Sequence, residues 1–88
     1  MILEVLTPER KIYSGEVYGI QLPGVEGLFE ILENHAPMVA ALGEGKMKII
    51  IDKNSNNSEV YHINGGFVET SNNKTSVVLE SAEPVEGK

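Results

Sequence analysis

The 88-residue sequence contains no cysteine and no tryptophan, and few of its residues are basic. The lack of cysteine excludes a disulfide framework, a cysteine-based zinc site and thiol catalysis. With 7 basic against 13 acidic residues the net charge is −6, which argues against binding of a nucleic-acid backbone. No apolar run approaches the roughly 18–20 residues of a membrane-spanning helix. No basic segment precedes the apolar N-terminus, so we do not expect a signal peptide.

The chain does contain enough apolar sequence, 41% of its residues, to form one modest core. A chain of this length is typical of a single domain. We expect this domain to span residues 1–82, with residues 83–88 as a frayed tail.

Alternation of apolar and polar residues recurs along the chain and is typical of β-strands. The clearest example is Met47, Ile49 and Ile51, which alternate with polar residues. No window of 11 or more residues has a clear helical period, and the best helix candidate, residues 33–42, is interrupted by Pro37. About nine to ten short strands, spaced by turn signals, predict an all-β fold: a flattened β-sandwich or barrel.

Two glycine-containing segments, residues 43–45 and 64–66, lie between apolar runs, and we interpret both as turns between separate strands. The polar segment 52–58 has no side chain that could help to build a core, so we expect a mobile hairpin tip there. The alternation also predicts the core. Its expected members are Leu3, Val5, Tyr18, Ile20, Ile31, Met47, Ile49, Ile51, Phe67, Val77 and Leu79.

Groups that could perform catalysis are scarce. A serine–histidine–aspartate triad would need His35 or His62 together with Asp52, the only aspartate, which opens the expected hairpin tip and is poorly placed as a buried orienting acid. Glu30, Glu33 and His35 match no standard metal-site spacing. The glycines lack the spacing of a phosphate-binding loop. We therefore expect no catalytic site, no metal, no cofactor and no nucleotide binding.

Several blocks of sequence together carry a family resemblance. They are residues 3–9 and 13–15, residues 26–38 with His35-Ala36-Pro37, residues 63–69 with Gly65-Gly66-Phe67, and residues 77–79. In this order they resemble the N-terminal domain of the epsilon subunit of the rotary F-type ATP synthase, over nearly the whole chain. Leu28 and Glu30 depart from the family pattern, which usually has a polar or acidic residue and a glycine there. Many members continue into a C-terminal helical hairpin with inhibitory or ATP-sensing roles, and this sequence ends where that hairpin would begin.

The resemblance implies a β-sandwich that performs no bond chemistry. Such a domain is a rotor subunit of the central stalk and couples the gamma subunit to the membrane rotor ring of a proton-translocating ATP synthase. The implied location is peripheral, on the cytoplasmic side of a bacterial inner membrane or an equivalent energy-transducing membrane.

The same resemblance implies two contact surfaces. The residues implied for the rotor ring are Val25, Glu26, Gly27, Leu28, Phe29 and Glu30. Those implied for the gamma subunit are Thr7, His35, Ala36, Pro37 and Met38. Glu26 with nearby Glu30 and Glu33 would give the ring-facing end a negative field that suits basic ring loops.

An alternative is a free-standing β-sandwich module that binds a peptide or a sugar. Sugar sites usually expose aromatic residues, whereas this chain has only three tyrosines and two phenylalanines, most of them inside strand patterns. Recovery of the chain together with stalk proteins would distinguish the two interpretations.

Overall fold

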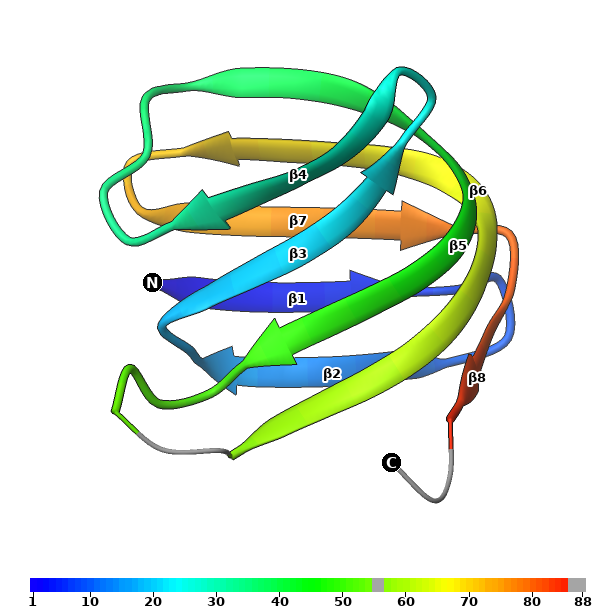
Figure 1. Cartoon of the computed structure of the whole chain (residues 1–88), viewed down its shortest axis with the longest axis horizontal. Coiled ribbons are helices and arrows are strands. Elements are labelled where there is room, and N and C mark those ends of the chain that lie inside the picture. The colour runs from blue at the N-terminus through cyan, green and yellow to red at the C-terminus, as the bar shows by residue number, and fades with distance from the viewer. Residues whose placement is uncertain (55–56, 86–88) are drawn as a thin grey trace.

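The structure, a computed structural model, describes residues 1–54 and 57–85, and every regular element in these ranges is a β-strand (Figure 1). The predicted all-β class is confirmed. The described strands are β1 (Ile2–Leu6), β2 (Lys11–Glu16), β3 (Gly19–Gly24), β4 (Gly27–Leu32), β5 (Met38–Ile50), β6 (Ser58–Ser71), β7 (Lys74–Leu79) and β8 (Ala82–Pro84).

The strands form one hydrogen-bonded sheet that folds over on itself. Along the sheet the order is β2-β1-β7-β6-β5-β3-β4, with β8 beside β6, and among the described strands only β1 and β7 run parallel. The long strands β5 and β6 curve together, so that β3 and β4 lie across β1 and β7 (Figure 1). Residues from both halves, such as Leu3 on β1 and Ile20 on β3, therefore meet in one buried core, as expected of a sandwich.

The sheet folds over at a bend inside β5 and β6, and we call this bend the corner of the sandwich. The prediction of turns at residues 43–45 and 64–66 is wrong, because both segments belong to continuous strands whose pairing keeps its register. Gly66 has a φ of +149°, and a Cβ there would collide with the Val78 carbonyl oxygen, so only glycine fits this part of the bend. Counting each bent strand as two explains the larger number of strands expected from the sequence.

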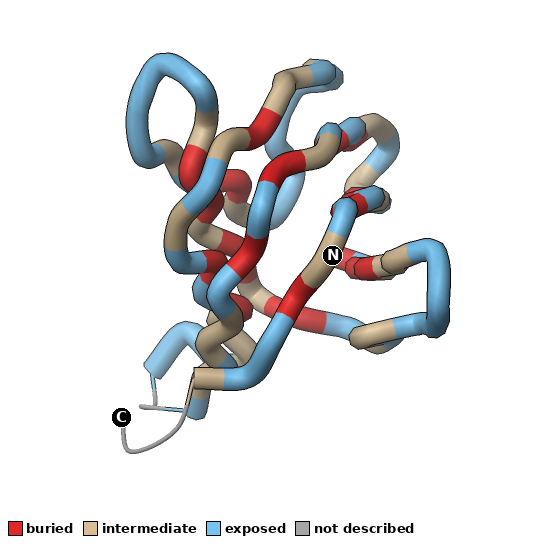
Figure 2. The backbone as a smooth tube through the Cα atoms, turned by 90° about the vertical axis from the view of Figure 1, so that its right-hand side faces the viewer, coloured by how far each residue is buried: buried red, intermediate tan, exposed pale blue. Residues whose placement is uncertain are grey.

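The corner also changes which residues face the core. In β6, Ile63 is buried before the corner and Val68 after it, so the inward face switches from odd to even positions. Phe67, expected in the core, is instead 62% exposed, and that prediction is wrong. Tyr18 and Ile51 are half-buried, and the remaining predicted core residues are buried. Figure 2 shows this alternation of buried and exposed positions along the strands.

The chain remains paired beyond the expected domain boundary. Strand β8 pairs with residues 61–63 of β6, and the Val85 N–H donates to the Val60 carbonyl oxygen at 2.9 Å. The tail expected from residue 83 therefore begins inside a paired strand. Its last residues, 86–88, and residues 55–56 of the expected hairpin tip lie outside the described residues.

Candidate interaction surfaces

The residues implied for the rotor ring form the tip of the β3–β4 hairpin and the first part of β4. Gly24 pairs with Gly27, so Val25 and Glu26 are its two tip residues, and Gly27 has the positive φ (+134°) that such tight loops need. Val25 and Leu28 are 67% and 64% exposed. The Val25 N–H donates to the Ala41 carbonyl oxygen on β5 at 3.2 Å, which ties the tip to the neighbouring long strand.

A hollow of about 440 Å³ lies between this hairpin and the start of β5. It is lined by Gly24, Val25, Glu26, Gly27, Leu28, Phe29, Met38, Ala40 and Ala41. Phe29 and Met38 are half-buried and also pack against the core. Met38, implied for the gamma subunit, thus lies beside residues implied for the ring.

The acidic residues of this region do not gather at one end. Glu26 is at the hairpin tip, whereas Glu30 lies along β4 and its carboxylate accepts a hydrogen bond from the Gln21 amide at 3.2 Å. Glu33 follows the far end of β4, about 20 Å from the tip at the usual rise of an extended strand. The prediction that Glu26, Glu30 and Glu33 together give this end a negative field is therefore wrong for Glu33. A carboxylate oxygen of Glu33 instead lies 3.5 Å from the α-amino nitrogen of Met1.

Of the segment implied for the gamma subunit, His35, Ala36 and Pro37 lie in the β4–β5 loop, residues 33–37, and Met38 is the first residue of β5. His35, Ala36 and Pro37 are all exposed. The Asn34 N–H donates to the Asn73 side-chain oxygen at 2.8 Å, and Asn34 adopts a φ of +64°. The His35 ring nitrogen Nδ1 contacts the Ala36 carbonyl oxygen at 2.7 Å, so its hydrogen bonding is local. The loop is therefore held at its base and presents three side chains to solvent.

Thr7 lies elsewhere on the molecule. Its N–H and its hydroxyl both donate to the Arg10 carbonyl oxygen, at 3.0 and 3.2 Å, in the turn between β1 and β2. In the sheet, strands β7 and β6 lie between β1 and β5. The cross-strand register aligns Met38 with Leu3 and not with Thr7. The structure therefore does not bring Thr7 together with His35–Met38: the turn after β1 and the loop before β5 lie at opposite sides of the view in Figure 1.

Between these two places lies an apolar row that the sequence analysis missed. Cross-strand pairing aligns Ala41, Phe67, Val78 and Leu6, on β5, β6, β7 and β1. Phe67 and Val78 are 62% and 53% exposed, so this row lies on the outer face of the sheet. We call Ala41, Phe67, Val78 and Leu6 together the outer row. Contiguous exposed apolar residues are unusual on proteins that have no partner. Only the change of face at the corner puts Phe67 outside, and no local sequence signal marks that change.

Two properties of the ionisable side chains in the described residues bear on a chemical role: their arrangement relative to that of a metal site, and their pKa shifts. Residues 1–54 and 57–85 contain no cluster of three or more histidine, aspartate or glutamate side chains that could hold a metal ion. Burial raises the pKa of Tyr13, and burial together with a hydrogen bond to Glu59 raises the pKa of Tyr61 to about 12. Both hydroxyls therefore stay protonated near neutral pH.

Over the same described residues the structure also offers no helix with the length and apolar character needed to cross a membrane.

Comparisons with known proteins give a consistent family. Residues 1–85 match the family described as the ATP synthase delta/epsilon chain, beta-sandwich domain. The chain is 41% identical over 83 residues to the ATP synthase epsilon chain of Maridesulfovibrio salexigens, covering 94% of this chain and 56% of that protein. It is 41% identical over 78 residues to the epsilon chain of Chlorobium limicola, covering 89% of this chain and 86% of that protein.

Two solved structures share the fold. A chain of the Euglena gracilis mitochondrial ATP synthase superposes with a TM-score of 0.88 at 22% identity, over 100% of this chain and 55% of the other. A chain of the Tetrahymena thermophila enzyme, solved as central stalk and c-ring, superposes with a TM-score of 0.75 at 19% identity, over 92% and 63%. At these identities the likeness is one of fold.

Proposed function

Because the chain belongs to the beta-sandwich domain family of the ATP synthase delta/epsilon chain, we propose that it is a non-catalytic subunit of the central stalk of a proton-translocating ATP synthase. In this role it joins the gamma subunit to the membrane rotor ring, so that both turn together. The observation that carries the proposal is the family match over residues 1–85. The proposed location is peripheral, on the cytoplasmic side of a bacterial inner membrane or its equivalent.

The surface proposed for gamma combines the β4–β5 loop with the outer row. Interfaces need an apolar patch with a polar rim, and the outer row supplies exposed Phe67 and Val78 in the middle of the sheet. Thr7 follows Leu6 at one end of the row, and His35, Ala36 and Pro37 precede β5, whose fourth residue, Ala41, forms the other end. The outer row thus links candidate residues that are not themselves neighbours.

The surface proposed for the ring is the β3–β4 hairpin. Its exposed tip offers Val25, Leu28 and one carboxylate, Glu26. With Glu33 at the far end of β4, the electrostatic part of this contact rests mainly on Glu26. The two-residue tip and its hydrogen bond to β5 make this surface stiff, which suits a part that transmits rotation.

A binding experiment with purified components tests the proposal. The immobilised chain is exposed, in separate experiments, to purified gamma subunit and to detergent-solubilised rotor ring. Both components come from an ATP synthase that can be reconstituted with this chain. We expect it to retain both, and Phe67→Ser to weaken retention of gamma while leaving the ring contact unchanged. The matched control is Val25→Ser, which should do the reverse. A folded chain that retains neither component would contradict the proposal and favour the free-standing peptide- or sugar-binding module.

A further inference from the structure

The turn between β6 and β7 consists of two asparagines with positive φ angles. Ser71 pairs with Lys74, so Asn72 and Asn73 form the loop, and their φ angles are +52° and +61°. Two positive φ angles in a two-residue hairpin loop are typical of a type I′ turn. Glycine suits the second position of this turn best, because it has no Cβ to oppose a positive φ. For the turn alone Asn73 is therefore a less favourable residue than glycine, which points to another role for its side chain.

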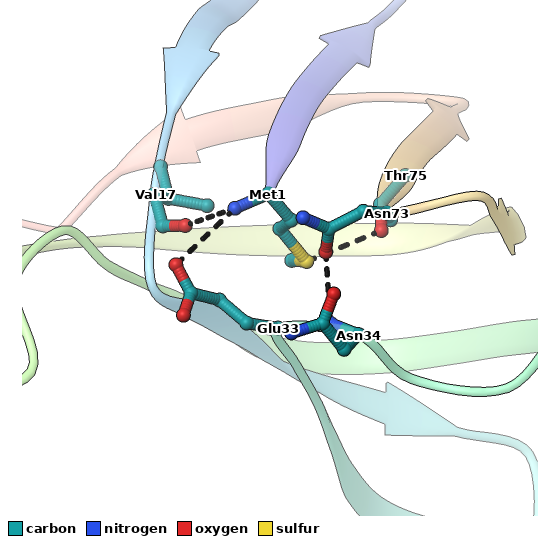
Figure 3. A network of polar contacts seen from close by, with 6 residues as sticks. All are labelled: Met1, Val17, Glu33, Asn34, Asn73 and Thr75. Atoms are coloured by element: carbon teal, nitrogen blue, oxygen red, sulfur yellow. Dashed lines mark hydrogen bonds and ion pairs between the residues drawn. The ribbon is translucent and has the colours of Figure 1, made fainter.

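The side chain of Asn73 reaches the β4–β5 loop. Its oxygen Oδ1 accepts a hydrogen bond from the Asn34 N–H at 2.8 Å, and Figure 3 shows the two residues facing each other. Asn73 is half-buried, whereas Asn72 is exposed and makes no side-chain hydrogen bond within residues 1–54 and 57–85. Two adjacent asparagines in one turn thus differ in whether they contact the loop.

The hairpin that presents Asn73 is itself well fixed. The Asn73 backbone carbonyl oxygen accepts a hydrogen bond from the Ile2 N–H on β1 at 3.1 Å. One pair further along the hairpin, the hydroxyl oxygens of Thr70 and Thr75 lie 2.8 Å apart, and both residues are buried. The Asn73 side chain therefore extends from a turn that is held by its own strands and by β1.

The β4–β5 loop begins with a turn that Asn73 joins to this hairpin. The His35 N–H donates to the Leu32 carbonyl oxygen at 3.2 Å, which closes a four-residue turn, and Asn34 lies within it with a φ of +64°. The exposed residues 35–37 follow directly, so the direction in which they leave the sheet depends on how this turn is oriented. The hydrogen bond from Asn34 to Asn73 links the turn to residues 39 positions further along the chain.

We propose that Asn73 is a positioning residue for the β4–β5 loop: its side-chain oxygen fixes the turn at Asn34 and so orients the exposed residues that follow. The amide oxygen can accept the Asn34 N–H without adding a charge. Glycine at position 73 would suit the β6–β7 turn but would leave this N–H without its partner. The asparagine therefore serves the neighbouring loop rather than its own turn.

This positioning does not depend on the proposed function. Its consequence for binding does, because the loop carries His35, Ala36 and Pro37, which are proposed to meet gamma. A loop that is fixed in advance loses less conformational entropy on binding than a loose one. Release of the loop should therefore weaken any contact that these three residues make.

Amide hydrogen exchange measured by NMR in the full chain tests the proposal. The Asn34 amide reports on the bond to Asn73 itself. The His35 amide, whose acceptor lies inside the loop turn, reports on whether the loop as a whole is released. The Ile49 amide, in the paired part of β5, reports on global opening.

Three variants distinguish the side-chain oxygen from the turn. Asn73→Gly removes the oxygen and keeps a residue suited to the turn, Asn73→Asp keeps an oxygen acceptor, and Asn72→Gly is the matched control in the same turn. Asn73→Gly should speed exchange at Asn34 and His35 by about two- to tenfold, as expected for the loss of one neutral hydrogen bond. Its melting temperature should stay nearly unchanged, because the better turn residue offsets the lost bond. Asn73→Asp should restore both rates, and Asn72→Gly should leave them unchanged.

Unchanged exchange at His35 in Asn73→Gly would overturn the proposal even if Asn34 became faster, because the loop would then stay in place without the bond. Exchange in Asn73→Asp as fast as in Asn73→Gly would overturn it too, since the acceptor oxygen would not matter. If Asn73→Gly also speeds exchange at Ile49, the ratio of the His35 rate to the Ile49 rate decides. A higher ratio supports the positioning role, and an unchanged ratio overturns it.

Binding of the same variants to purified gamma separates this proposal from the functional one. Faster exchange in the loop together with weaker binding supports both. Faster exchange with unchanged binding keeps Asn73 as the positioning residue and counts against His35, Ala36 and Pro37 as gamma contacts.

Discussion

Ile49 tests the position of the core at the scale of one residue. It is fully buried in β5, opposite Ile20 on one side and Glu59 on the other. Ile49→Ala removes buried methyl groups and leaves a cavity, so we expect the free energy of unfolding to fall by about 2–5 kcal/mol. The matched control is Val39→Ala on the same strand, 70% exposed, which should change it by less than about 0.5 kcal/mol. Urea unfolding measures both, and equal effects would contradict the assigned inward face.

His35 tests the gamma contact. Its side chain is exposed and contacts only the adjacent Ala36 carbonyl among the hydrogen bonds described, so His35→Ala should leave the melting temperature unchanged. If the loop meets gamma, the substitution should weaken binding by about 1–3 kcal/mol, mainly through faster dissociation. His62→Ala, at another exposed histidine, is the control and should bind normally. A sharp loss of melting temperature with intact binding would make His35 a structural residue.

Tyr61 gives a dependence on pH with a definite sign. Burial first, and then the hydrogen bond to Glu59, raise its pKa from 10.0 to about 12. A pKa that is higher in the folded than in the unfolded chain means that the stabilisation is complete below pH 10 and is lost as the pH rises through 12. The melting temperature should therefore fall over that window, and Tyr61→Phe should flatten the fall. Because the pKa of Tyr13 is also raised, part of the fall should remain; an unchanged profile in the variant would contradict the assignment.

At the scale of the strands, the corner depends on Gly66. Its φ of +149° is unfavourable for other residues, and a Cβ would collide with the backbone of β7. Gly66→Ala should lower the free energy of unfolding by at least about 1–3 kcal/mol. Gly43, at the same corner on β5, has no positive φ, and a Cβ there would meet its nearest atoms at an ordinary 4.0 Å. Gly43→Ala should thus be neutral or slightly stabilising, and equal costs in thermal unfolding would refute this account of the bend.

The strands show how far the sequence leads. Alternation predicts strands such as the second half of β5, and the family resemblance predicts the segments 25–30 and 35–38, because these are local patterns. The corner is not local: a glycine pair between apolar runs looks the same in a turn and in a bend, and only the unbroken pairing of β5 with β6 distinguishes them. For the same reason the sequence misplaces Phe67.

The relations between candidate residues depend on the same long-range pairing. Glu33 is seven residues from Glu26 in the sequence, yet an extended β4 puts the two at opposite ends. The contact between Glu33 and Met1 likewise joins residues that lie far apart in the sequence and that no local pattern relates.

At the scale of the whole molecule, the two proposed surfaces belong to one continuous sheet. The β3–β4 hairpin is tied to β5, β5 pairs with β6 over its length, and β6 carries Phe67 of the outer row. A force applied at the hairpin tip thus reaches the outer row through paired backbone rather than through a flexible link. A subunit that joins two rotating parts needs this stiffness, and it needs its two contacts to be independent.

Salt dependence tests that independence. Glu26→Lys should weaken binding to the ring several-fold at low salt, because it reverses the charge at the hairpin tip. Near 1 M salt, where the screening length is about 3 Å, the difference from the unaltered chain should largely vanish. Binding to gamma should not change at either salt concentration, since the tip lies outside the outer row. Glu83→Lys on β8 makes the same change in net charge away from the tip and should affect neither contact. If both variants weakened ring binding equally, only the overall charge of the molecule would matter, and the hairpin would lose its assigned role.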